Sequence, residues 1–183
     1  MTAPTYFIGL DNGHTGALAV LHRDGTFEDI WETPTVKYGT ETRIDEKALW
    51  AILASFEPDQ CFITFEAGQK QPQFGTKGNF TNGVSHGTIR TLVALSGIAY
   101  QEVDPATWQR PILRAVRGAG TNTKGASLEF CRRNWPSLDL RGHDGMSDAL
   151  CLAEFGRRLK LQGAVSDGSD TPGRAKRKVK NSV

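Results

Sequence analysis

Four acidic residues occupy positions where folding could bring their carboxylates together. Asp11 ends the apolar run TYFIGLD, and Glu66 ends a second apolar run, CFITFE. Asp144 and Asp148 lie four residues apart in RGHDGMSDAL, which places them on one face of a helix start. If the two apolar runs pair as parallel strands, Asp11 and Glu66 lie about 5 Å apart, one strand spacing. Carboxylates this close favour a hard divalent cation such as Mg²⁺, which prefers oxygen ligands.

Each acid also has an ordinary structural role that the sequence allows. Asp11 precedes an Asn-Gly pair and can begin a turn, whereas Glu66 and Asp148 can be surface residues of a strand and a helix. Asp144 precedes a glycine at a helix start, which is typical of an N-cap. His143 is a lone loop histidine, and such residues are more often solvated than catalytic. The recurrence of acids at two strand ends and one helix start favours a metal site over these separate explanations.

Turns and apolar spacing predict the elements that position these acids. The Asn-Gly and Asp-Gly pairs near the N-terminus are strong hairpin signals, so the first three apolar runs predict an antiparallel meander. A helix then crosses to the next strand, which favours parallel pairing. The predicted strands are 5–11, 16–22, 26–32, 61–66 and 98–103, and the predicted helices are 45–56, 83–97, 106–113, 123–134 and 145–162. This order predicts an α/β fold, a mixed sheet with helices on its faces.

The length of 183 residues suits one domain with one substantial core. We expect this domain over 1–163 and a basic tail over 164–183, whose composition is typical of disordered segments that contact nucleic acid or aid solubility. No apolar stretch is long enough for a membrane helix and no signal peptide is recognisable, so we expect a cytoplasmic protein. The spacing of Cys61, Cys131 and Cys151 argues against a zinc site or a disulfide framework.

Taken in chain order, several motifs resemble the RuvC-like Holliday junction resolvases of the ribonuclease H-like superfamily, especially the divergent versions carried by phages. The resemblance extends over roughly residues 5–158 and rests on FIGLDNGHTGALAV, FITFEAG, VDPATW, Lys124 and HDGMSDALCLAEFGRR. It implies a five-stranded mixed sheet in the order 3-2-1-4-5, a homodimer, and two Mg²⁺ or Mn²⁺ ions per active site. It also implies cleavage of paired strands at four-way DNA junctions, in the bacterial host cytoplasm if the protein is phage-encoded.

The resemblance also implies roles for individual residues. Asp11 would bridge both ions, and Glu66 and Asp148 would complete their coordination spheres. Asp144 or His143 would bind or position the attacking water. Lys124 matches a lysine that the family uses at its site. The implied catalytic residues are Asp11, Glu66, Asp144, Asp148, Lys124 and His143, and the four acids among them are the implied metal ligands.

The chain departs from the family's pattern at two places. The cellular resolvases carry an acid or a histidine three residues before the final aspartate, where this chain has Gly145. Asp144 would therefore act from a slightly different point on the turn. The family often has a lysine near Trp108, where this chain has Arg110. Positive charge near the scissile phosphate would then come from Arg110 or Lys124.

The segment 69–80 alternates basic and aromatic residues directly after the fourth predicted strand. Such side chains could contact phosphates and stack on bases at a junction. The alternative is a surface loop whose phenylalanines fold back into the core. The predicted DNA contacts are Lys70, Phe74, Lys77, Arg110 and Lys124.

Three other functions fit parts of the sequence. The segment DNGHT after a strand matches the phosphate loop of the actin and sugar-kinase class, but those enzymes duplicate the fold and need a second phosphate hairpin. A non-catalytic nucleic-acid-binding module would not need the four acids. A ribonuclease H-like nuclease acting on RNA–DNA hybrids or other branched DNA is hardly separated from a junction resolvase by sequence. We expect no nucleotide cofactor and no membrane partner.

Overall fold

The chain begins with an antiparallel meander, as predicted. The structure is a computed structural model that describes residues 3–69, 75–116, 123–140 and 143–166. Its first three strands, which pair antiparallel in succession, are β1 (Tyr6–Leu10), β2 (Ala17–His22) and β3 (Phe27–Glu32). Gly13 and Gly25, in the two connections, have φ angles of 118° and 93°, which glycine adopts at no steric cost. Both hairpin signals in the sequence are therefore confirmed.

The main sheet has five strands in the order β3-β2-β1-β6-β7. Its fourth and fifth strands in chain order are β6 (Cys61–Glu66) and β7 (Ala99–Val103), and both continue the sheet by parallel pairing from β1. Parallel neighbours need a crossover, which α1 (Glu46–Ala54) and the short helix η1 (Pro58–Gln60) supply before β6. The predicted sheet order 3-2-1-4-5 is confirmed.

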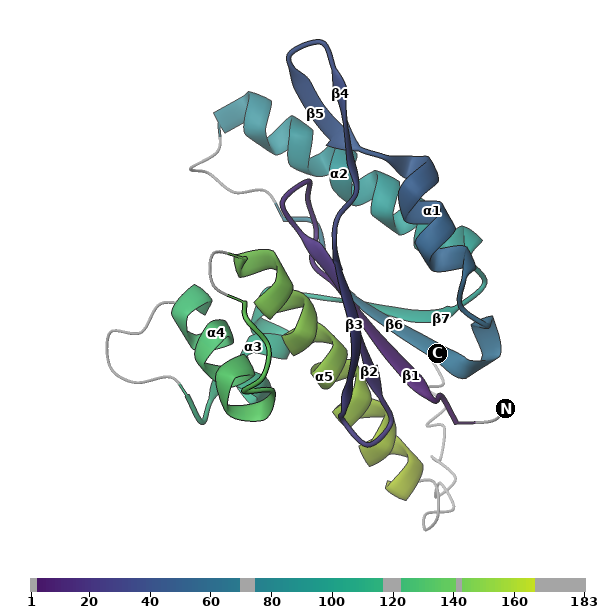
Figure 1. The fold of residues 1–183 in the computed structure, drawn as a ribbon, viewed down its shortest axis with the longest axis vertical. Coiled ribbons are helices and arrows are strands. Elements are labelled where there is room, and N and C mark those ends of the chain that lie inside the picture. Colours follow the sequence, from purple (N-terminus) through teal and green to yellow (C-terminus); the bar gives the residue numbers. More distant parts are fainter. Residues whose placement is uncertain (1–2, 70–74, 117–122, 141–142, 167–183) are drawn as a thin grey trace, which may run out of the picture.

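Helices cover both faces of this sheet (Figure 1). One face carries α1 and α2 (Gly75–Leu95), and the other carries α3 (Pro105–Leu113), α4 (Thr123–Asn134) and α5 (Asp144–Ser166). Alternation along the strands divides the buried side chains between the faces, with Ile8 and Phe65 on the α1 and α2 side and Ala17 and Ala19 on the α5 side. In the described ranges, no helix is long and apolar enough to cross a membrane.

Three details differ from the sequence-based prediction. α2 begins at Gly75, so residues 75–80 of the predicted loop are helical. Glycines and polar residues hide the helical periodicity there, and the buried positions of α2 begin only at Ser85. A hairpin of β4 (Thr35–Tyr38) and β5 (Glu41–Ile44) was not predicted and forms a separate two-stranded sheet. α5 continues to Ser166, past the predicted domain end, and the rest of the predicted tail lies outside the described residues.

α5 crosses β1 so closely that only a glycine fits beneath it. A Cβ atom on Gly9 would lie 1.9 Å from the carbonyl oxygen of Ala149 and 2.3 Å from the backbone nitrogen of Ala153. Both distances are far below van der Waals contact, and both partners are backbone atoms that cannot move alone. The backbones of the strand and the helix are therefore in direct contact.

Two further glycines fix α5 at either side of this crossing. A Cβ on Gly145, in the first turn of α5, would lie 2.5 Å from the carbonyl oxygen of Thr15 in the β1–β2 loop. A Cβ on Gly156 would lie 2.1 Å from Oγ1 of Thr64 in β6. The position of α5 along its axis is thus set by contacts with two strands and one loop.

Replacement of Gly9 by valine should prevent this contact and destabilise the fold by at least about 3 kcal/mol, the upper range for an overpacked core position. Gly163→Ala is the control, because Gly163 lies in α5 with open space at its Cβ position. The Gly163→Ala protein should be as stable as wild type or more stable by up to about 1 kcal/mol, since alanine favours helices more than glycine does. Urea denaturation followed by circular dichroism measures both, and a Gly9→Val protein as stable as wild type would contradict the proposed contact.

Candidate active site

The ends of β1 and β6 bring the first two acids of the predicted set to one edge of the sheet. Leu10 pairs with Phe65 in the parallel register, and Asp11 and Glu66 are the residues that follow them. Neighbouring strands lie about 4.8 Å apart, so the two backbones are at the distance that the sequence predicted. This edge is the carboxyl end of the parallel strands, where α/β proteins commonly bind ligands.

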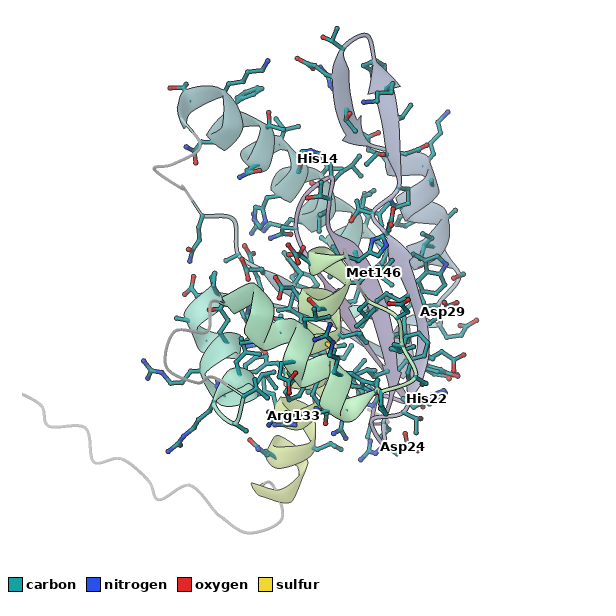
Figure 2. All side chains as sticks on the ribbon, turned by 60° about the vertical axis from the view of Figure 1, so that its left-hand side comes forward. His14, His22, Asp24, Asp29, Arg133 and Met146 are labelled. Atoms are coloured by element: carbon teal, nitrogen blue, oxygen red, sulfur yellow. The ribbon has the colours of Figure 1, made fainter. Side chains whose placement is uncertain are left out.

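α5 adds the third and fourth acids to this edge. Asp144 is the first residue of the helix, and Asp148 lies one turn later. The contact of Gly145 with the β1–β2 loop places this first turn beside Asp11. An open pocket of about 520 Å³ results, and its lining residues are Asp11, His14, Thr15, Gly16, Glu32, His143, Asp144, Gly145, Met146 and Asp148. Figure 2 labels His14 and Met146, which belong to the two sides of this pocket.

Glu66 is half-buried, and its carboxylate accepts a hydrogen bond from an indole. Nε1 of Trp108 in α3 donates a hydrogen bond of 2.8 Å to Oε2 of Glu66. Burial raises the pKa of Glu66, the Trp108 hydrogen bond opposes this rise, and the carboxylates of Asp148 and Asp104 add to it. The influence of Asp148 on this pKa shows that the strand acid and the helix acid are electrostatic neighbours. Trp108 is buried and is also a hydrogen-bond partner of Glu66.

Asn12 is a second neighbour of Glu66 that sequence reasoning left without a role. Its Nδ2 donates to the backbone carbonyl oxygen of Glu66, which ties the β1–β2 loop to the end of β6. Its Oδ1 is buried and has no hydrogen-bond partner among the described residues. The sequence feature that could have identified Asn12 is its position directly after Asp11. The interpretation of Asn-Gly as a turn gave Asn12 a different role.

A carboxylate that was not predicted, Glu32, also lines the pocket. It ends β3 and pairs in register with Ala17, the first residue of β2. Its Oε1 lies 3.1 Å from Nδ1 of His143, and both residues line the pocket. The predicted meander already implied this position, because the end of the third strand meets the start of the second. The candidate His143 is therefore at the site, and Glu32 is its partner.

The donor set fits a divalent cation in its chemistry. Carboxylate oxygens and one amide oxygen are ligands that Mg²⁺ and Mn²⁺ accept, and a cation would relieve the unfavourable burial of Glu66 beside Asp148. As placed, no group of three or more His, Cys, Asp or Glu side chains in the described ranges is close enough to hold a metal ion. Side chains would have to rotate inward around the ion.

The two predicted DNA contacts that the structure describes do not line the pocket. Lys77 in the first turn of α2 and Arg110 in α3 are exposed, and neither lines the pocket. Lys70, Phe74 and the side chain of Lys124 lie outside the described residues.

Two arginines of α5 stabilise a buried carboxylate. Arg157 and Arg158 both donate hydrogen bonds to the buried carboxylate of Glu154, at 2.7 Å and 2.6 Å. A buried carboxylate without these partners would destabilise the folded protein, so both guanidinium groups stabilise the fold.

Glu66→Gln should stabilise the metal-free protein near pH 7.5, because it removes a half-buried carboxylate whose pKa is raised by burial. Because the pKa of Glu66 is raised in the folded protein, this residue contributes fully to stability below the ordinary carboxyl pKa. That contribution is lost as the pH rises through the folded-state pKa. The difference between wild type and Glu66→Gln should therefore vanish near pH 4. Trp108→Phe, which removes the opposing hydrogen bond, should destabilise at pH 7.5. Urea titrations in EDTA at both pH values measure these changes, and a Glu66→Gln variant less stable than wild type at pH 7.5 would contradict them.

No protein-family model and no curated protein matches this sequence. Among solved structures, the fold is similar to RuvC from Thermus thermophilus, with a TM-score of 0.54 at 14% identity. It is also similar to the same organism's RuvC in complex with a Holliday junction substrate, with a TM-score of 0.52 at 11% identity. Each comparison covers 86% of this chain and 96% of the RuvC chain. The chain therefore has the ribonuclease H-like fold seen in RuvC, with a mixed five-stranded sheet and flanking helices.

Proposed function

We propose that this protein is a metal-dependent endonuclease that hydrolyses phosphodiester bonds in branched DNA, with the four-way junction as its preferred substrate. The observation that carries the proposal is the arrangement of Asp11, Glu66, Asp144 and Asp148. Asp11, Asp144 and Asp148 line one open pocket, and Glu66 ends the strand next to β1, on a fold similar to that of RuvC. The similarity to RuvC in complex with a junction supports the choice of substrate.

The residues present would divide the work at this edge. Asp11, between the β6 end and the α5 start, would bridge two ions, with Glu66 and Asp148 completing their coordination. Two Mg²⁺ or Mn²⁺ ions would supply Lewis acidity toward water and toward the leaving oxygen. Asp144 and His143 line the pocket, where they would position the attacking water. Glu32 holds Nδ1 of His143, which leaves Nε2 to accept a proton.

Symmetric cutting of a junction needs two such sites related by a two-fold axis, so we propose a homodimer. One face of α2 supports it, because Phe80, Val84 and Leu95 are large apolar side chains exposed along that face. Their spacing along α2 places these three side chains within about one-sixth of a full turn of one another around the helix axis. Gly83 and Gly87 beside them have open space at their Cβ positions, so they do not serve contact with the sheet.

Cleavage of labelled substrates tests the activity directly. With Mg²⁺ or Mn²⁺, the wild type should cut a synthetic four-way junction in preference to a replication fork, linear duplex and an RNA–DNA hybrid. Asp11→Asn should lower the rate at least about 100-fold, since it removes the charge that would bridge both ions. Asp59→Asn is the matched control, because Asp59 is exposed in η1 at the opposite end of β6. Preferential cutting of the hybrid would indicate a ribonuclease H activity, and full activity of Asp11→Asn would refute the metal centre.

Light scattering at micromolar protein concentration tests the dimer. The wild type should have twice the mass of one chain, and Phe80→Asp with Val84→Asp should give a monomer, because two buried charges without partners oppose association. A wild type that is monomeric under these conditions would contradict the proposed interface.

A further inference from the structure

The β4–β5 hairpin is a part of the chain that the proposed catalytic edge does not use. It forms a sheet of its own and projects beyond the five-stranded sheet (Figure 1). A two-stranded hairpin gains little stability by itself in water, and most side chains of this one are exposed. A projecting element whose side chains pack little against the rest of the protein is a candidate for contact with a partner.

The hairpin projects from the end of the molecule that carries the acidic pocket. Glu32, which lines the pocket, is three residues before Thr35, the start of β4. Four-residue strands extend about 13 Å, so the hairpin tip stands roughly that far beyond its base. In Figure 2 the hairpin and His14 lie toward one end of the molecule, and His22 and Asp24 lie toward the other. A long polymer bound at the pocket would pass within reach of the hairpin.

Side chains near the tip combine an aromatic ring with cations. Tyr38 is 61% exposed, and the guanidinium carbon of Arg43 lies 5.3 Å from the centre of its ring. Lys37 donates a hydrogen bond of 2.7 Å to the hydroxyl of Thr42, which orders its ammonium without neutralising it. An exposed ring and an ordered cation match the two features of nucleic acid, stacked bases and phosphates.

Charges around the hairpin are partly balanced. Glu41 accepts a hydrogen bond of 2.8 Å from Arg43, and Lys77 in α2 is close enough to act on the Glu41 carboxylate. Glu46 at the start of α1 also acts on Arg43. Among the described residues, no carboxylate forms a salt bridge with Lys37 or Lys77, and both lysines are exposed to solvent.

We propose that the β4–β5 hairpin, with Lys77 of α2 beside it, is a DNA-binding arm that holds the phosphate backbone of the substrate and stacks Tyr38 on an unpaired base near the junction centre. This inference rests on the proposed function for its substrate and concerns binding alone. Glu41 limits the affinity of the arm, because it holds Arg43 and repels phosphates.

Binding of a fluorescent four-way junction, measured by anisotropy at several salt concentrations with Ca²⁺ in place of Mg²⁺, tests the arm. Lys37→Ala should weaken binding about 3- to 10-fold and lower the slope of log affinity against log salt by about one per hairpin. Tyr38→Ala should weaken binding about 5- to 30-fold, whereas Tyr38→Phe should bind like wild type because stacking is kept. Glu41→Gln should bind about 3-fold more tightly, a gain that a purely structural hairpin would not give.

Lys160→Ala is the matched control, since Lys160 is an exposed lysine near the far end of α5 from the pocket. It should leave both the affinity and the salt slope unchanged. If the wild type binds the junction through the hairpin and cuts nothing with Mg²⁺, the proposed nuclease activity fails and the arm stands. If junctions are cut while Lys37→Ala, Tyr38→Ala and Glu41→Gln all bind like wild type, the arm is overturned and the nuclease stands. Absence of any DNA binding overturns both.

Discussion

The direct backbone contact between α5 and β1 is the constraint on which the candidate site depends. Gly9 lets the helix lie against the strand, and Gly145 lets its first turn lie against the β1–β2 loop. A residue with a Cβ at either position would lift the helix away from the sheet. Because Asp144 and Asp148 belong to that same first part of the helix, the contact also fixes how far they lie from Asp11. The packing of α5 against β1 therefore also determines where the acids of α5 lie.

The acidic edge is held together at an electrostatic cost. Burial and the carboxylate of Asp148 both raise the pKa of Glu66, and the hydrogen bond from Trp108 opposes the rise without cancelling it. Asn12 binds the backbone of Glu66 and keeps its own Oδ1 buried. Strained groups of this kind persist where function needs them and where the surrounding fold is strong enough to hold them. Two well-packed cores, one on each face of the sheet, supply that strength.

The chain carries two exposed surfaces of different character. The face of α2 with Phe80 and Val84 is apolar and is the contact proposed for a second copy of the chain, whereas the β4–β5 hairpin, which carries Tyr38 and Lys37, is the proposed DNA-binding arm. Both lie on the side of the sheet opposite α5 or project beyond it, so neither competes with α5 for packing (Figure 1). The sheet positions the acids, and the surfaces around it would decide which substrate reaches them.

The sequence by itself determined the elements whose signals are local. Asn12-Gly13 and the apolar runs beside it predicted the meander, and the acid after each buried run predicted the neighbouring carboxylates Asp11 and Glu66. The start of α2 and the β4–β5 hairpin were missed, because glycine-rich and very short segments have no clear period. Tertiary packing alone brings Trp108 and Asn12 to Glu66, Glu32 to His143, and Arg157 to Glu154. These are contacts between residues far apart in the chain, and they exist only once packing has set the distances between elements.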